Sequence, residues 1–194
     1  MRETPNFTGW QAMVLHREDG NTEKLIRQLR LLGIHATLQW APLSAAALLP
    51  DLVIVDADQG WDDLLPWHGE TPACPVVALL GSEAPGRIAW ALGQGAGAII
   101  AKPIATSAVY PALVMAVSLH RERKATAEKL QYLEERVRLR PLVHAAVEKL
   151  QAAHGIDEES AYAILRNCAM RRRLPMEQIS AFILAGAEPL PEAG

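Results

Sequence analysis

The chain has 194 residues, half of them hydrophobic, and a formal net charge of -3. This length suffices for one medium domain and one small domain, and the charge excludes binding to nucleic acid through overall positive charge. Residues 1–120 carry 7 Lys/Arg and 11 Asp/Glu, whereas residues 121–194 carry 12 and 11. Any basic surface in the C-terminal part must therefore be local.

The N-terminal segment and the cysteines indicate the cellular compartment of the protein. The opening MRETPNFTGW lacks the apolar segment of a signal peptide, and no stretch reaches the roughly 18 apolar residues of a membrane span. Cys74 and Cys168 are the only cysteines, and both lie in apolar patterns typical of buried free thiols. We expect a cytoplasmic protein without a membrane segment or a disulfide.

Four short apolar runs, and a segment at 34–40 that alternates loosely as a strand near a sheet edge does, predict five β-strands in the first 120 residues. They are residues 12–15, 34–40, 52–55, 75–80 and 98–101. Leu25, Leu29 and Leu32 recur at helical spacing after the first run and stop at Gly33, a typical helix C-cap. Continuous apolar runs separated by helices favour an α/β fold, with a parallel sheet covered on both faces. Functional groups are then expected where the strands end, at residues 16–17, 56, 80 and 102.

A helical pattern begins at Thr106 and continues to Pro141, which we interpret as the first residue of a new helix. Its apolar residues approximate a short coiled-coil seam, interrupted by Arg123, Thr126 and Arg140. The residues predicted to mediate dimerisation are Leu119, Leu130, Leu133 and Val137.

Three short helices are predicted after Pro141, over residues 142–153, from the N-cap Asp157 onward, and from Met176 after a Leu174-Pro175 turn. The predicted domains are therefore residues 1–118, a coiled coil over 119–140, and a three-helix domain over 141–188. About 50 residues in three helices form a marginal core, which docking or dimerisation would stabilise.

Three segments of the N-terminal part resemble response-regulator receiver domains: PDLVIVDAD at 50–58, CPVVALLG at 74–81 and GAGAIIAKPI at 95–104. The resemblance implies a flavodoxin-like, five-stranded parallel sheet. It also implies that Asp56 occupies the phosphoacceptor position and Lys102 the lysine of the Lys-Pro dipeptide. In receivers an acidic pair after the first strand holds Mg²⁺, and a Ser or Thr after the fourth strand contacts the phosphoryl group.

The sequence departs from the receiver pattern at both of these places. If the first strand ends at Leu15, His16 and Arg17 replace the acidic pair, and Arg17 could pair with Asp56 in place of a metal ion. A later register would bury two basic groups without partners. Mg²⁺ would then lack the ligands it needs, so we expect a receiver-like domain that is not phosphorylated by the usual route. The predicted remnants of the receiver site are Asp56, Lys102, His16, Arg17 and Leu80.

The C-terminal segment HAAVEKLQAAHGIDEESAYAILRNCAMRRRLPMEQISAFIL, residues 144–184, resembles the ANTAR family, the AmiR- and NasR-type transcription antitermination regulators. The resemblance implies binding to paired stem-loops in leader mRNA, which prevents terminator formation. The order of receiver-like domain, coiled coil and ANTAR domain is AmiR-like. It implies control by a ligand-sensing negative regulator protein. One departure is Ala146, which we align with a position where the family usually carries Lys.

Arginines near the end of the second short helix are the predicted RNA contacts, because a guanidinium matches phosphate or a guanine edge. Taken alone, Arg171–Arg173 also fit a solvated helix C-terminus. Tyr162 could stack on a base or pack in the core, and Arg166 lies one turn later on the same face. The predicted RNA-binding residues are Tyr162, Arg166, Arg171, Arg172 and Arg173.

Several other classes are less favoured. There is no Gly-rich phosphate loop or nucleophile elbow, so we expect no enzyme and no cofactor. His144 and His154 lack a third ligand nearby, so no metal site is expected. The last helix carries no basic residue, which makes DNA an unlikely partner. Two alternatives stay open: a phosphorylation-dependent two-component regulator acting through Asp56, and a protein-interaction module that binds no nucleic acid.

Overall fold

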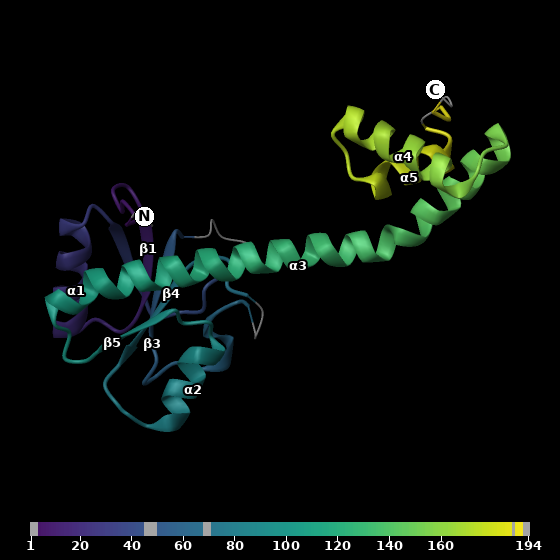
Figure 1. The fold of residues 1–194 in the computed structure, drawn as a ribbon. Coiled ribbons are helices and arrows are strands. Elements are labelled where there is room, and N and C mark those ends of the chain that lie inside the picture. The colour runs from purple at the N-terminus through teal and green to yellow at the C-terminus, as the bar shows by residue number, and fades with distance from the viewer. Residues whose placement is uncertain (1–3, 45–49, 68–70, 188, 192–194) are drawn as a thin grey trace. The chain divides into compact units, whose positions relative to one another are not determined.

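The computed structural model describes residues 4–44, 50–67, 71–187 and 189–191 (Figure 1). The chain divides into two compact units, residues 1–126 and residues 127–194. In the described parts of the chain, no helix is both long and apolar enough to cross a membrane. Each unit has its own hydrophobic core.

The first unit is built on a five-stranded parallel sheet with the strand order β2-β1-β3-β4-β5. The strands are β1 (Gln11–Leu15), β2 (His35–Gln39), β3 (Leu52–Asp56), β4 (Val76–Leu80) and β5 (Ala98–Ala101). This is the flavodoxin-like order, so the predicted fold class is confirmed. β3 and β4 are buried throughout, whereas β2 and β5 form the partly exposed edges. The continuous apolar runs thus correspond to central strands covered on both faces.

Alternate residues of the central strands serve two cores, one on each face of the sheet. Ile54 and Leu79 pack with α1 (Gly20–Leu31) and the start of α3 (Thr106–His154). Val53 and Val55 pack with α2 (Pro85–Gly93) and the short 3₁₀ helix η1 (Asp62–Leu64). The sheet is therefore the middle layer of three, as Figure 1 shows.

In the residues that the structure describes, two of the connections between strands contain no α-helix. η1 is the only helical segment in the described residues between β3 and β4, and residues 40–44 and 50–51 between β2 and β3 are not helical. Pro66, Pro72 and Pro75 lie in the first of these connections, and proline disfavours helix interiors. The second face of the sheet is covered instead by side chains from loops, including the buried ring of Trp67.

No new helix begins at Pro141, contrary to the prediction. α3 is one helix of 49 residues and passes through both Pro111 and Pro141. A proline removes one backbone hydrogen bond and crowds the preceding turn. The residues after Pro141 are fixed by packing, since Val147 and Leu150 are fully or nearly fully buried in the second core. Tertiary packing therefore overrides the local preference to break.

The second unit contains the end of α3, α4 (Glu158–Arg172) and α5 (Met176–Ala185). The Asp157 side chain caps α4 by accepting the amide of Ser160 at 2.8 Å, as predicted. Ala161, Leu165 and Ala169 form the buried stripe of α4, also as predicted. Among the described residues of the tail, Leu190 packs on this core and the carbonyl of Pro191 lies 3.0 Å from Nε2 of His154.

Candidate functional site

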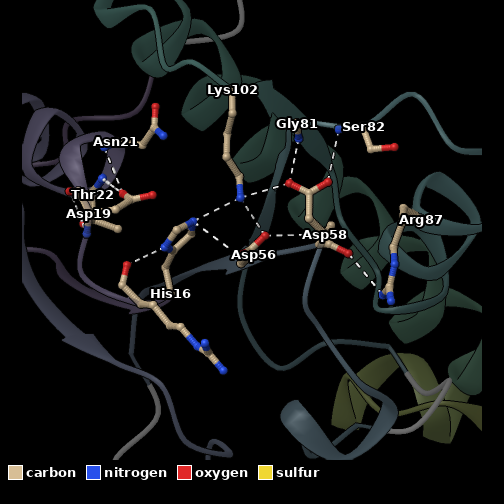
Figure 2. A network of polar contacts seen from close by, with 12 residues as sticks. His16, Asp19, Asn21, Thr22, Asp56, Asp58, Gly81, Ser82, Arg87 and Lys102 are labelled. Atoms are coloured by element: carbon tan, nitrogen blue, oxygen red, sulfur yellow. Dashed lines mark hydrogen bonds and ion pairs between the residues drawn. The ribbon is translucent and has the colours of Figure 1, made fainter.

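The carboxyl ends of three strands bring His16, Asp56 and Lys102 together (Figure 2). Asp56 ends β3, His16 follows β1 directly and Lys102 follows β5. The Nζ of Lys102 donates to Oδ1 of Asp56 at 2.7 Å, and Nε2 of His16 lies 3.3 Å from Oδ2 of Asp56. Both His16 and Asp56 are buried, at 4% and 1% exposed. The predicted end of the first strand at Leu15 is confirmed.

Hydrogen bonding fixes the orientation of the His16 ring. Nδ1 lies 2.6 Å from the carbonyl oxygen of Arg17, so it carries a proton and donates. Nε2 lies 3.1 Å from Nζ of Lys102 and can accept from that ammonium group. Lys102 thus contacts both the imidazole of His16 and the carboxylate of Asp56, and it provides the positive charge next to the buried carboxylate.

Asp58 is a fourth member of this cluster that the sequence reading did not identify. Its Oδ2 lies 3.0 Å from Nζ of Lys102 and accepts the amide of Gly81 at 2.8 Å, while Oδ1 accepts the amide of Ser82 at 3.1 Å. The only signal in the sequence is the spacing of Asp56 and Asp58, which is common in acidic loops and gives no indication of these amide contacts.

The charges of this cluster stabilise one another. Burial by itself lowers the pKa of the Lys102 ammonium, but hydrogen bonds to Asp56 and Asp58 outweigh it and raise that pKa above its usual value. Burial likewise opposes ionisation of Asp58, yet the contacts with Lys102 and with the amides of Gly81 and Ser82 lower the pKa of the carboxyl group. Both groups are therefore charged across the physiological pH range.

Besides the contacts of Asp58, hydrogen bonds from α2 hold the loop after β3 in place. Nη1 of Arg87, in α2, donates to the carbonyl of Gly60 at 2.8 Å and to that of Ala57 at 3.3 Å. A side chain at Gly60 would collide with the ring of Trp90, because its Cβ would lie 2.2 Å from a ring carbon. Loop, α2 and strand ends thus form one connected polar network.

Arg17 and Leu80 lie apart from the charges of this cluster. The guanidinium of Arg17 lies over the ring of Trp40, 5.8 Å from its centroid, so the suggested pairing of Arg17 with Asp56 is wrong and Lys102 takes that role. Leu80 is 8% exposed and packs in the core on the α2 side. Asp19 caps α1 by accepting the amides of Asn21 and Thr22. Its carboxylate therefore stabilises a helix end.

In the parts of the chain that the structure describes, no three His, Cys, Asp or Glu side chains are grouped to hold a metal ion. Three groups that would serve an anion, the ammonium of Lys102 and the amides of Gly81 and Ser82, already contact Asp58. The arrangement is a closed cluster in which two carboxylates, one ammonium and one imidazole contact one another.

A second candidate site lies on α4, where the predicted RNA-binding residues are exposed. Arg166, Arg171 and Arg173 have no acidic partner among the described residues. Arg173 is the C-cap of α4 in the left-handed conformation, with φ 55° and ψ 36°, and is the one non-glycine residue with positive φ in the described ranges. Arg171 and Arg172 lie in the last turn, where cations complement the helix dipole.

The other predicted residues of the second unit lie in different environments. The ring of Tyr162 is 47% exposed and lines a groove with Leu133 and Val137. Leu130, Leu133 and Val137 of the predicted seam are exposed at 56%, 45% and 71%. Leu119, the earliest predicted seam residue, lies in the first unit and is partly buried. Ala146 is fully buried, so a lysine could not be accommodated there without repacking the core.

Two models of known protein families match this chain, one in each compact unit. The family model described as the AmiR N-terminal domain matches residues 10–117, and the ANTAR domain model matches residues 131–184. The chain is 33% identical over 138 residues to the transcriptional regulatory protein PdtaR of Mycobacterium tuberculosis (strains CDC 1551 / Oshkosh and H37Rv), covering 70% of this chain and 67% of PdtaR. Among solved structures, the response regulator StyR is 14% identical with a TM-score of 0.54, over 90% of this chain and 98% of StyR.

Proposed function

This chain belongs to the ANTAR family of transcription regulators and carries an AmiR-type receiver-like domain, and from that premise we propose that it is an RNA-binding antiterminator. It would bind stem-loops in leader mRNA and block formation of the terminator. In this proposal neither unit catalyses a reaction. The receiver-like unit is a docking surface, and the second unit binds RNA.

The observation that carries the proposal is the group of exposed arginines on α4. Arg166, Arg171 and Arg173 have no acidic partner in the described chain, so their guanidinium groups are available for phosphate or base edges. RNA loops are recognised by shape, stacking and phosphate contacts, which a small helical surface with several arginines can supply. A left-handed backbone at a non-glycine residue such as Arg173 is unfavourable, and such strain concentrates at functional sites.

Control by a protein partner is supported by the contacts of Asp56. Its carboxylate is buried against Lys102 and His16, and phosphorylation would require both the displacement of these groups and a metal ion. We propose that a ligand-sensing negative regulator binds the protein until an inducer releases it. Phosphorylation-dependent control is the alternative, and chemistry at Asp56 tests it directly.

Dimerisation is the third part of the proposal. Leu130, Leu133 and Val137 expose apolar surface on one helix, and pairing with a second copy would bury it. The partly buried Leu119 would contribute less. Two linked RNA-binding units gain affinity for two hairpins through effective concentration, without any further contact.

The test is a titration of a two-hairpin leader RNA with the full chain, in a salt series, with duplex DNA of equal length as competitor. Alanine at Arg171, Arg172 and Arg173 should weaken binding and reduce the salt slope by about two to three, since each phosphate contact contributes roughly 0.7–0.9. The matched control replaces Lys24, Arg27 and Arg30 of α1 by alanine, which removes the same charge from the other unit.

The control variant should bind RNA like the wild type. Equal and weak binding of the wild type to RNA and DNA would reject antitermination and favour a protein-interaction module. An unchanged salt slope in the Arg171–Arg173 variant would remove these residues from the RNA surface.

A further inference from the structure

An open groove in the second unit, with a volume of about 590 Å³, is unexplained by RNA binding through the arginines of α4. α3 contributes Leu133, Val137 and Arg140 to its lining, α4 contributes Tyr162 and α5 contributes Glu177. Leu133, Val137 and Tyr162 are each between 45% and 71% exposed. Exposed apolar side chains that line one groove make it a candidate binding surface.

Glu177 is the residue that indicates what the groove binds. Its side chain is 10% exposed, and its Oε1 accepts from Nε of Arg136 at 3.0 Å. Its Oε2 is buried and has no hydrogen-bond partner in the described chain. A carboxylate oxygen without a partner is unfavourable when buried, so an incoming group that donates a hydrogen bond would complete it. A charged donor such as a guanidinium would form the strongest such bond.

Arg140 is a donor of this kind. It is exposed, and no acidic partner faces it in the part of the chain that the structure describes. It follows Leu133 by seven residues and Val137 by three, so it continues their row along α3. If two copies of α3 pair in parallel about a two-fold axis, equivalent residues of this row approach one another. The two Arg140 side chains would then repel each other unless an acidic group neutralises them.

We propose that the groove is occupied by α3 of a second copy of this chain, and that Oε2 of Glu177 accepts a hydrogen bond from the Arg140 guanidinium of that copy. The proposal rests on the dimer proposed above and specifies it. The interface is not confined to the row of apolar residues, because Tyr162 of α4 and Glu177 of α5 belong to it. By symmetry each copy provides one carboxylate and receives one guanidinium, so each Arg140 gains a carboxylate partner.

Two features favour a second copy over RNA in this groove. The apolar residues Leu133 and Val137 repeat at coiled-coil spacing, which fits a helix better than a phosphate backbone. The Oε2 of Glu177 that has no partner is a hydrogen-bond acceptor, so it fits a donor group better than a phosphate oxygen. Tyr162 is therefore assigned to the dimer interface, and Arg166 and Arg171–Arg173 remain the proposed RNA contacts.

The experiment measures the dimer dissociation constant of the full chain by sedimentation equilibrium, for the wild type and three variants. Glu177→Gln and Arg140→Gln should each raise the constant about tenfold or more, because each leaves the other charge without its partner. The double variant should be no weaker than either single variant, since both remove the same pair. Glu135→Gln is the matched control on α3, as Glu135 is exposed and does not line the groove.

Arg140→Gln should fold like the wild type, because Arg140 is exposed and plays no part in the core. A change in the dissociation constant of this variant is therefore not due to misfolding. A dissociation constant unchanged in both variants, additive effects in the double variant, or a monomeric wild type would each overturn the proposal. RNA binding at protein concentrations well above the dissociation constant separates this inference from the proposed function. Variants that dimerise normally while the wild type binds RNA would reject the inference alone. A wild type that dimerises as proposed but binds no RNA would reject the antitermination function alone.

Discussion

The ammonium nitrogen of Lys102 lies 3.0 Å from Oδ2 of Asp58, a carboxylate two residues beyond the end of β3. Lys102 also donates to Asp56 at 2.7 Å, so one cation is shared by two carboxylates. The amides of Gly81 and Ser82 complete the environment of Asp58. The receiver-like unit thus contains its own anion at a place with three hydrogen-bond donors, and this has consequences that can be measured.

Removal of the Asp58 carboxylate should create a site for a free anion. In Asp58→Ala, the amides of Gly81 and Ser82 and the ammonium of Lys102 lose a shared acceptor, and such convergent donors bind phosphate. We expect inorganic phosphate to bind the variant in the millimolar range, and ³¹P NMR line broadening to report it. Asp63→Ala removes a nearby exposed carboxylate and should bind no phosphate. If Asp58→Ala behaves like this control, the donors do not form an anion site.

Phosphorylation of the wild type should fail. Acetyl phosphate with Mg²⁺ should give no adduct by intact-mass analysis, because Asp56 is 1% exposed and contacts Lys102 and His16. A receiver domain that is known to be phosphorylated, treated in parallel, shows that the reagent is active. One phosphoryl group per chain, located at Asp56 by peptide mapping, would instead establish a phosphorylation-dependent regulator.

Lys102→Met should destabilise the first unit by about 3 kcal/mol, because it leaves the buried carboxylate of Asp56 without its ammonium partner. In the wild type the raised pKa of Lys102 means that its contribution is complete below 10.5 and is lost only at higher pH. The lowered pKa of Asp58 means that its contribution is complete above 3.8 and is lost only at lower pH. The contact between Lys102 and Asp58 should therefore stabilise the wild type evenly from pH 5 to pH 9.

Urea unfolding at neutral pH should show this deficit in Lys102→Met, because the buried carboxylate of Asp56 loses the ammonium that donates to it at 2.7 Å. Lys24→Met, on the exposed face of α1, should unfold like the wild type. A Lys102→Met variant that is as stable as the wild type would mean that the ammonium does not stabilise this cluster.

Arg173 offers a variant in which stability and RNA binding should change in opposite directions. Its φ of 55° is a conformation that favours glycine, so Arg173→Gly should stabilise the second unit by about 0.5–1 kcal/mol. The same change removes a cation and should weaken RNA binding. Arg173→Ala removes the cation but keeps the backbone strain, so it should weaken RNA binding without a gain in melting temperature. A glycine variant that binds RNA like the wild type would exclude Arg173 from the RNA surface.

Much of the first unit could be predicted from the sequence. Central strands of a parallel sheet are buried on both faces, and the runs at 52–55 and 76–80 therefore appear as continuous apolar residues. The same runs place Asp56 and Lys102 at one edge of the sheet. The contact between them follows from the topology, because β3 and β5 lie on either side of β4 and all three end at this edge.

The contacts of Asp58 could not be predicted in this way. They depend on the path of the loop after β3, which is set by Arg87 of α2 and by the approach of Trp90 to Gly60. The continuous course of α3 through Pro141 was also unpredictable from local preference, because packing of Val147 and Leu150 decides it. The function of the arginines on α4 stays a prediction, because the same arginines are expected at a solvated helix end and at an RNA-binding surface.

The single helix α3 has different neighbours along its length. Ala116 packs against the sheet so closely that a Cβ on Gly97 would lie 2.9 Å from its Cα. Leu130 and Val137 are exposed, and Leu150 belongs to the core of the second unit. Three different requirements therefore act along one helix: small size at Ala116, apolar character without a fixed volume near Val137, and close packing at Leu150. A related sequence could keep the helix and still lose the function of one segment alone.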